Sequence, residues 1–243
     1  MAPFLSVIIP AFNEERLIAA TLEEIVNYLD AQDYSWDVAV VDDGSTDTTA
    51  QIVRAFARES PKVSLLSVEH GGKGWAVKNG MVRSRGEYRF LCDADLSMPV
   101  EQLYRFLPPS SSGFDIAIGS REVLGARRIG EPFRRHAMGR VYNHMVRTLA
   151  VPGIYDTQCG FKCFRGEVAE EIFPLQKSHG FSFDVEVLFL ARKKGLRIEE
   201  VPIDWYYRSE SKVRAYRDSW VMTRDILTMR WRHLTGGYRH GPS

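Results

Sequence analysis

Two aspartates one residue apart, Asp93 and Asp95, directly follow an apolar run at residues 88–92. Residues i and i+2 of a strand point to the same side, so a chain leaving such a strand can aim both carboxylates at one point. Mg²⁺ and Mn²⁺ prefer oxygen ligands, are often shared with substrate phosphates, and would offset the repulsion between the two carboxylates. The pair therefore predicts a divalent metal site, with an acidic turn at the end of a strand as the alternative.

Acidic and amide side chains follow two further apolar runs. Asn13 and Glu14 come after the first run, and Asp42 and Asp43 come after the second. A carboxylate at the end of a strand can accept hydrogen bonds from a nucleobase or from ribose hydroxyl groups. The alternative is that Asp43 or Ser45 caps the helix that follows. These residues alone leave both interpretations open.

A glycine-rich turn at residues 70–74, with Lys73 between glycines, precedes a helix predicted to run to about residue 82. Glycines let the backbone approach a phosphate closely, and the ammonium group of Lys73 adds positive charge there. The turn lacks the spacing of a Walker A loop and does not match Gly-x-Gly-x-x-Gly. The second mismatch disfavours a nicotinamide cofactor.

Strands and helices alternate four times in the first half of the chain. Short apolar runs predict strands at residues 5–10, 37–44, 63–68, 88–92 and 115–119. Apolar stripes predict helices after the first two, a helix to about residue 82 follows the third, and Pro99 favours a helix at residues 99–107 after the fourth. This alternation predicts an α/β fold with a mostly parallel central sheet and helices on both faces. Because ligands bind at the carboxyl ends of the strands in such sheets, the four polar motifs should converge on one site.

The alternation weakens after residue 119. We expect a basic loop at 121–135, helices at 134–149, 183–194 and 218–234, a polar turn at 156–162 that enters a short strand, and a last strand at 197–205. The chain contains no internal repeat and no linker that would isolate a second domain. Residues 1–243 are therefore predicted to form one domain.

The composition, 44% hydrophobic and 26% charged, is that of a globular protein, but the charge is unevenly placed. Residues 1–118 hold 10 Lys or Arg against 17 Asp or Glu, whereas residues 119–243 hold 22 against 14. A basic second half suggests an anionic partner such as a phosphate, a membrane surface or nucleic acid. Three cysteines without zinc-site spacing indicate a reducing compartment. We expect neither a signal peptide nor a membrane span.

Together these motifs resemble the family 2 inverting glycosyltransferases, which bind nucleotide sugars with an α/β fold called GT-A. The resemblance rests on residues 7–14 and 41–47, on the turn with Lys73, and on Asp93-Ala94-Asp95. Later motifs are similar to those of the polyprenyl-phosphate hexosyltransferases, and they lie at residues 119–121, 156–162, 183–186 and 209–212. The stretch at 156–162 looks like the branch that transfers glucose. The similarity runs from about residue 5 to residue 238.

The resemblance implies that glucose moves from UDP-glucose to a polyprenyl (dolichyl-type) phosphate with inversion, giving a β-linked product. It implies that Asp93 and Asp95 hold Mg²⁺ or Mn²⁺ against the diphosphate, and that Asp184 and Arg121 take part in catalysis. The expected donor site, in the half formed by residues 1–118, comprises Pro10, Ala11, Asn13, Glu14, Asp42, Asp43, Lys73, Asp93, Ala94 and Asp95. The expected acceptor site, in the half formed by residues 119–243, comprises Arg128, Arg208, Ser211 and Lys212. A lipid phosphate is largely dianionic at pH 7, so a strong general base is unnecessary.

Two features depart from the family pattern, and other functions stay open. Eukaryotic relatives carry an N-terminal membrane anchor, whereas this sequence begins at the first strand, and Ser97 stands where some mannosyl relatives have a glutamine beside the metal site. The alternatives are transfer from GDP-mannose, transfer to a soluble acceptor such as phosphoglycerate, and a binding protein without turnover. A nucleic-acid-binding module is disfavoured because the basic loop carries Phe133 as its one aromatic residue.

The last predicted helix mixes aromatic, sulfur-containing and basic residues. They are Trp220, Met222, Arg224, Met229, Arg230, Trp231 and Arg232. Such a helix can lie in a membrane interface, and the alternative is that its apolar residues pack on the core. We expect a cytoplasmic protein at the cytoplasmic face of a membrane, held by the lipid surface or by a membrane-anchored partner.

Overall fold

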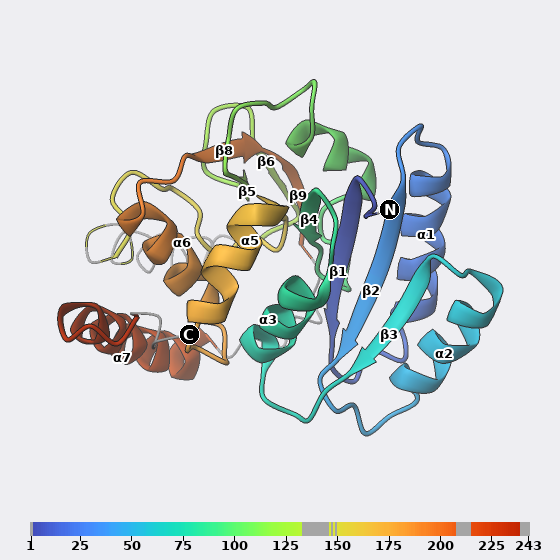
Figure 1. Cartoon of the computed structure of the whole chain (residues 1–243), viewed down its shortest axis with the longest axis horizontal. Coiled ribbons are helices and arrows are strands. Elements are labelled where there is room, and N and C mark those ends of the chain that lie inside the picture. Colours follow the sequence, from blue (N-terminus) through green and yellow to red (C-terminus); the bar gives the residue numbers. More distant parts are fainter. Residues whose placement is uncertain (1, 133–145, 147, 149, 208–214, 239–243) are drawn as a thin grey trace.

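A computed structural model describes residues 2–132, 146, 148, 150–207 and 215–238, with only the backbone described at 215–223. Its centre is a seven-stranded sheet in the order β3-β2-β1-β4-β7-β5-β8 (Figure 1). The strands are β1 (Leu5–Ala11), β2 (Trp36–Asp42), β3 (Val63–Ser67), β4 (Tyr88–Leu91), β5 (Ile116–Ser120), β7 (Lys162–Arg165) and β8 (Ile198–Pro202). Both halves of the chain contribute strands to this one sheet.

The register of the sheet brings the ends of β1, β2 and β4 to the same edge. Strand β1 pairs in parallel with β2, where Ala11 lies opposite Asp42, and with β4, where Ile8 lies opposite Leu91. Strand β7 is antiparallel to both β4 and β5, and β5 pairs in parallel with β8. The prediction of a mostly parallel sheet is confirmed, with one antiparallel strand, β7, inserted between β4 and β5.

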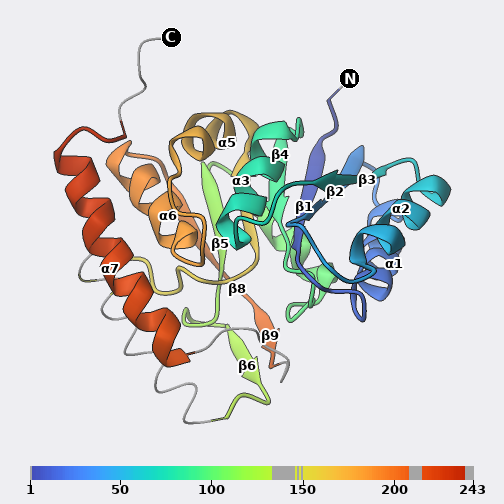
Figure 2. The ribbon, with the colours of Figure 1, turned by 90° about the horizontal axis from the view of Figure 1, so that it is seen from below.

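Helices cover both faces of the sheet, as the alternation predicts (Figures 1 and 2). They are α1 (Ile18–Asp30), α2 (Thr49–Glu59), α3 (Lys73–Arg83), η1 (Val100–Phe106), α5 (Gly166–Ile172), η2 (Phe173–Leu175), α6 (Phe183–Lys193) and α7 (Ala215–Leu234). Alternate residues of β1 enter different cores, because successive side chains of a strand point to opposite faces. Val7 and Ile9 belong to the buried cluster that includes residues of α1 and η1, whereas Ile8 belongs to the cluster that includes residues of α3 and α6.

Several elements differ from the sequence prediction. The helix expected at 99–107 is the 3₁₀ helix η1, and the strand expected at 197–205 breaks after Pro202, beyond which β9 (Asp204–Tyr206) forms its own sheet with β6 (Arg127–Ile129). A bidentate ion pair between Arg127 and Asp204, at 2.7 and 2.8 Å, joins these two short strands. Strand β6 thus lies inside the segment predicted to be a loop. The helix expected at 134–149 lies outside the described residues, apart from residues 146 and 148.

Candidate active site

The loops that follow β1 and β2 are tied together at the carboxyl edge of the sheet. The backbone N–H of Asn13 donates to Ser45 Oγ at 2.9 Å, and the N–H of Thr46 donates to Asn13 Oδ1 at 2.8 Å. Asn13 has a φ of 52°, in the left-handed region that asparagine tolerates better than most residues. Asn13 therefore shapes the edge of the site, while Ser45 fixes this loop rather than capping α2.

Asp42 and Asp43 are both buried but do different things. The Oδ1 atom of Asp42 accepts one hydrogen bond, from the N–H of Ser45 at 3.1 Å. The two oxygens of Asp43 accept hydrogen bonds from the N–H groups of Gly71 and Gly72, each at 2.9 Å, and the imidazole of His70 lies 2.9 Å from Oδ2. Asp43 thus holds the glycine turn, and Asp42 is the better placed of the two to meet a nucleoside.

The glycine turn is packed against protein backbone, which differs from the phosphate cradle that its sequence suggests. A Cβ atom at Gly72 would lie 2.8 Å from the carbonyl oxygen of His179, and one at Gly74 would lie 2.7 Å from the carbonyl oxygen of Ser178. The first N–H groups of the turn already donate to Asp43. These glycines therefore allow helix α3 to approach residues 178–183, which brings Lys73 to the site.

Lys73 joins the glycine turn to the carboxylate pair. Its Nζ lies 2.7 Å from Oδ1 of Asp93, and both side chains are about three-quarters buried. Burial alone would lower the pKa of Lys73, but the charges of Asp93, Asp184 and Asp95 outweigh it and raise the pKa. Lys73 is therefore a permanent positive charge beside the pair.

Asp95 lies in a tight turn after β4. Its Oδ1 accepts the N–H of Ser97 at 2.9 Å, and Leu96 between them adopts a φ of 43°. Asp93 and Asp95 both keep part of their surface accessible to solvent. The turn thus presents two carboxylates at the edge of the sheet where the loops after β1 and β2 also lie.

The donor set of Asp93 and Asp95 fits a hard divalent cation. Both side chains offer only oxygen atoms, and no group of three or more His, Cys, Asp or Glu residues suited to a metal occurs among the described residues. Two carboxylates are too few to complete a metal's coordination. Mg²⁺ commonly binds through one or two carboxylates and takes its other ligands from water and substrate phosphates. The pair therefore suits a metal that arrives with a diphosphate.

Asp184 lies at the start of α6 and extends this network of charges inward. Its Oδ1 lies 2.7 Å from Nζ of Lys162, and both groups are almost fully buried. Burial raises the pKa of Asp184, and the charges of Lys162 and Lys73 act against that rise. Asp93, Lys73, Asp184 and Lys162 therefore form a cluster of alternating charges that extends from the carboxylate pair into the interior.

Arg121 lies at the end of β5 and is held by Asp156. Its Nε and Nη2 donate to the two carboxylate oxygens at 2.6 and 2.8 Å, and its backbone N–H donates to the same side chain at 3.0 Å. Burial would raise the pKa of Asp156, but the charge and hydrogen bonds of Arg121 dominate and lower it to about 2. Glu200 in turn fixes the loop that carries Asp156, because its carboxylate accepts the N–H of Asp156 at 3.0 Å.

Backbone groups dominate at the other predicted donor-site residues. Pro10 lies opposite Val41 in the register of β1 and β2, and the carbonyl oxygen of Ala11 accepts the N–H of Asp43 at 2.9 Å. The N–H of Glu14 donates to Thr49 Oγ1 at 2.8 Å. The carbonyl oxygen of Ala94 accepts the hydroxyl of Thr21 at 2.6 Å. These contacts fix the loops around the carboxylates.

A family model, "Glycosyl transferase family 2", matches residues 6–173. The chain belongs to this family. A dolichyl-phosphate beta-glucosyltransferase of Dictyostelium discoideum is 35% identical over 96% of this chain and 76% of its own length, and one of Saccharomyces cerevisiae is 34% identical over 97% and 77%. A glucosyl-3-phosphoglycerate synthase structure from Mycobacterium tuberculosis, with Mn²⁺, UDP-glucose and phosphoglyceric acid, is 18% identical with a TM-score of 0.68, covering 93% of this chain and 78% of that one. That structure supports the GT-A fold of this family 2 glycosyltransferase.

The predicted acceptor residues are only partly accounted for. Arg128 lies between Glu122 and Glu131, whose oxygens approach its guanidinium to 2.5 and 2.7 Å. In this arrangement the charge of Arg128 is already compensated. Arg208, Ser211 and Lys212 lie outside the described residues.

Two residues of the site were not predicted from the sequence. Lys162 is the partner of Asp184, and Gly160 contacts the carboxylate of Asp93. Both belong to the stretch at 156–162, which stood out only as a marker of one glycosyltransferase branch. Neither a glycine nor a buried lysine carries a signal of its own, because both contacts are made between segments far apart in the sequence.

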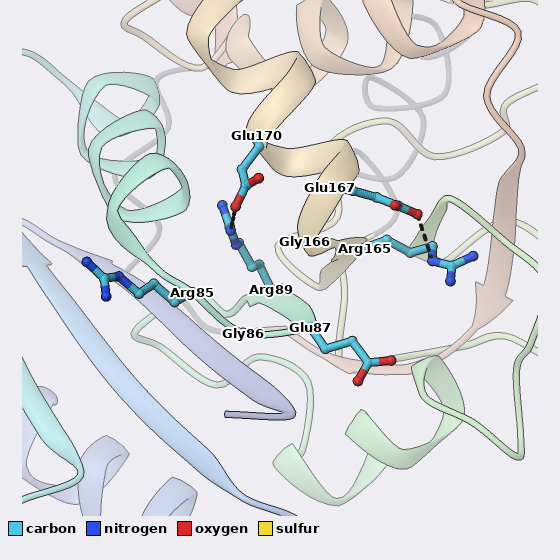
Figure 3. Close-up of a pocket in the computed structure, with 8 residues that line it drawn as sticks. All are labelled: Arg85, Gly86, Glu87, Arg89, Arg165, Gly166, Glu167 and Glu170. Carbon is cyan, nitrogen blue, oxygen red and sulfur yellow. Dashed lines mark hydrogen bonds and ion pairs between the residues drawn. The ribbon is translucent and has the colours of Figure 1, made fainter. Parts of the chain in front are cut away.

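A pocket of about 270 Å³ lies at the opposite edge of the sheet (Figure 3). It is lined by Arg85, Gly86, Glu87, Arg89, Arg165, Gly166, Glu167 and Glu170. The buried Arg89 of β4 forms an ion pair there with Glu170 of α5 and donates to the carbonyl oxygen of Met81 at 2.7 Å. These contacts tie α5 and α3 to the sheet, away from the carboxylate pair.

Proposed function

We propose that this chain transfers glucose from UDP-glucose to a dolichyl-type polyprenyl phosphate with inversion, acting as a single domain. The observation that carries the proposal is its similarity, over 96–97% of its length, to glucosyltransferases named for dolichyl phosphate. The placement of Asp93 and Asp95 beside Lys73, at the edge where Asp42 also lies, supports a nucleotide-sugar site.

On this proposal the donor lies along the carboxyl edge of β1, β2 and β4. Asp42 would accept hydrogen bonds from the uridine, and Asn13 and Glu14 would border it. Asp93 and Asp95 would hold Mg²⁺ or Mn²⁺, which supplies Lewis-acid stabilisation of the leaving diphosphate when bound. The positive charge of Lys73 favours the same diphosphate, since its pKa is raised and it stays protonated.

The acceptor needs orientation more than activation. A phosphate monoester is largely dianionic at pH 7, so its oxygen attacks without losing a proton to the protein. Asp184 is paired with Lys162 and lies among the charges of the site, which suits it to orienting a substrate rather than removing a proton. Arg121, whose guanidinium and backbone N–H are both bound by Asp156, would take part in catalysis from this fixed position. Arg128, together with Arg208, Ser211 and Lys212, remains our proposal for the acceptor phosphate.

Helix α7 supports a position at a lipid surface. Its inward face carries Ile226 and Met229, which are buried and pack on the core, as one of the two alternatives for this helix predicts. Its outward face carries Leu227, Trp231 and Leu234, which are 56%, 64% and 82% exposed. An apolar stripe with a tryptophan, flanked by exposed Arg224, is typical of a helix that lies in a membrane interface. We therefore propose peripheral binding at the cytoplasmic face of a membrane, directly or beside an anchored partner.

No described helix is both long enough and apolar enough to cross a membrane.

A panel of radiolabelled nucleotide sugars and acceptors tests the proposed reaction. The full chain is assayed with UDP-glucose or GDP-mannose, and with dolichyl phosphate or 3-phosphoglycerate, in the presence of Mg²⁺ or Mn²⁺. We expect transfer to lipid from UDP-glucose that EDTA abolishes. Preferential use of GDP-mannose, or transfer only to phosphoglycerate, would overturn the proposed substrates, and absence of any turnover would favour a binding protein.

A further inference from the structure

Gly160 lies so close to the carboxylate of Asp93 that a side chain at position 160 has no room. A Cβ atom at position 160 would lie 2.1 Å from Oδ2 and 2.4 Å from Cγ of Asp93. Real Cβ atoms essentially never come within 3.0 Å of a neighbouring heavy atom. Any side chain at position 160 therefore requires either the backbone or the Asp93 side chain to move.

The backbone at Gly160 cannot easily shift away from Asp93, because the side chains of both neighbouring residues are buried in the core. Cys159 is buried, with its Sγ packed against the Cα of Gly119. Phe161 is fully buried and packs edge-on against Phe90 with ring centroids 5.0 Å apart. The carbonyl oxygen of Phe161 also accepts the N–H of Gly119 at 2.8 Å. Moving Gly160 would disturb a close-packed interior.

The backbone around Asp93 is equally fixed. The N–H of Cys92 donates to the carbonyl oxygen of Ile8 at 3.0 Å, continuing the ladder between β1 and β4. On the other side, the carbonyl oxygen of Ala94 accepts the buried hydroxyl of Thr21 at 2.6 Å. Because both backbones are fixed, the clash would be relieved by rotation of the Asp93 side chain, which would move its carboxylate away from its present position.

We propose that Gly160 is a positioning residue: by leaving space beside Asp93, it lets the carboxylate keep its present orientation, from which Asp93 would bind the metal. In that orientation Oδ1 of Asp93 lies 2.7 Å from Nζ of Lys73, so the same space also preserves this ion pair. The inference rests on the proposed metal site and gives a physical role to the stretch at 156–162. Removing the space displaces a ligand without changing the chemistry of any charged group.

Manganese binding tests this role separately from turnover. We compare the full-length native chain with Gly160→Ala, and with Gly180→Ala as a control, because a Cβ at Gly180 meets no atom within 4 Å. Mn²⁺ is titrated in the presence of UDP and followed by electron paramagnetic resonance. We expect Gly160→Ala to weaken Mn²⁺ binding about 10- to 100-fold, the range found when groups that orient metal ligands are altered. UDP binding in EDTA should be unchanged, and Gly180→Ala should match the native chain.

A stability cycle keeps the inference falsifiable if the variant folds poorly or the native chain binds no metal. Gly160→Ala is compared in the native background and in the Asp93→Ala background, with thermal unfolding as the readout. If the carboxylate is the obstacle, the second background should relieve most of the destabilisation. Equal destabilisation in both backgrounds, or unchanged Mn²⁺ affinity in a folded Gly160→Ala chain that binds the metal, would overturn the proposal. A native chain that binds no Mn²⁺ would instead count against the proposed metal site alone.

Discussion

Removing one partner of the ion pair between Lys162 and Asp184 should destabilise the fold far more than breaking an equally short pair at the surface. Its Nζ–Oδ1 distance is 2.7 Å, and the two side chains are 1% and 6% exposed. The pair between Lys194 and Glu171 has the same 2.7 Å separation, but its side chains are 32% and 45% exposed. Substituting each lysine with methionine removes the charge at similar length. The two variants therefore isolate the effect of burial.

Burial decides the expected magnitudes. Removing one partner of a buried pair leaves an uncompensated charge and typically costs about 3–5 kcal/mol, whereas an exposed pair contributes about 0–1 kcal/mol. Lys162→Met also removes a hydrogen bond to the carbonyl oxygen of Cys159. We expect the free energy of unfolding, measured by urea denaturation near pH 7, to fall by about 3–5 kcal/mol in Lys162→Met and by less than about 1 kcal/mol in Lys194→Met.

The pH dependence supplies an independent check on the same pair. Burial raises the folded-state pKa of Asp184, and Lys162 limits that rise. Without Lys162 the pKa should rise further, so the folded variant takes up a proton as the pH falls and loses its unpaired charge. An acid whose pKa is raised on folding favours the folded state at low pH, and that contribution is lost as pH rises through the folded pKa. The stability gap between native and Lys162→Met should therefore narrow from about pH 7 to about pH 5.5. Equal costs for both lysine variants, or a gap that widens on acidification, would refute this reasoning.

Three further predictions concern the proposed metal site, the arginine-bound loop and α7, and a fourth concerns the glycine turn. Asp95→Ala should lower glucose transfer at least about 100-fold, while the lost hydrogen bond to Ser97 should lower the melting temperature only slightly, and full activity in this variant would remove Asp95 from the metal site. Because its pKa is lowered to about 2, Asp156 should contribute about 2 kcal/mol to the free energy of unfolding above about pH 4, and this contribution should be lost as the pH falls toward 2. Circular dichroism of the native and Asp156→Asn chains during acid titration measures this loss, and identical unfolding profiles would contradict the prediction. Trp231→Ala should reduce co-sedimentation with anionic lipid vesicles, and unchanged binding would exclude this face of α7. Gly74→Ala should lower the free energy of unfolding by about 1–3 kcal/mol, because its Cβ would meet backbone oxygens at 2.7 and 2.8 Å, whereas Gly180→Ala, which meets nothing, should not.

Local patterns in the sequence were sufficient to predict the first half of the fold. Each apolar run before a polar motif became a parallel strand, and the polar motifs after β1, β2 and β4 lie at one edge. Amphipathic periodicity likewise predicted α1, whose residues Ile18, Leu22 and Leu29 are fully buried. These predictions succeeded because strand and helix periodicity are properties of short segments.

Features that depend on distant partners could not be predicted in the same way. Residues 162–165 look like any short strand, and nothing local indicates that they enter the sheet between β4 and β5 in the antiparallel direction. The turn at 70–74 has the composition of a phosphate loop, but the N–H groups of Gly71 and Gly72 donate to Asp43, and Gly72 and Gly74 pack against residues 178–183. The roles of Gly160 and Lys162 likewise depend on Asp93 and Asp184, which are brought near only by the folded chain.

The interior position of β7, between β4 and β5, means that one neighbour of β4 is synthesised long after β4 itself. Until residues 162–165 emerge, β4 lacks its second neighbour and forms the exposed margin of a four-stranded sheet, although all its residues are buried in the finished fold. Unpaired, apolar edge strands recruit other chains and promote aggregation. A fragment ending near residue 118 should therefore aggregate and should not serve as a separate nucleotide-binding module. Strand β7, which is synthesised after β4 and β5, completes the sheet by pairing with both of them.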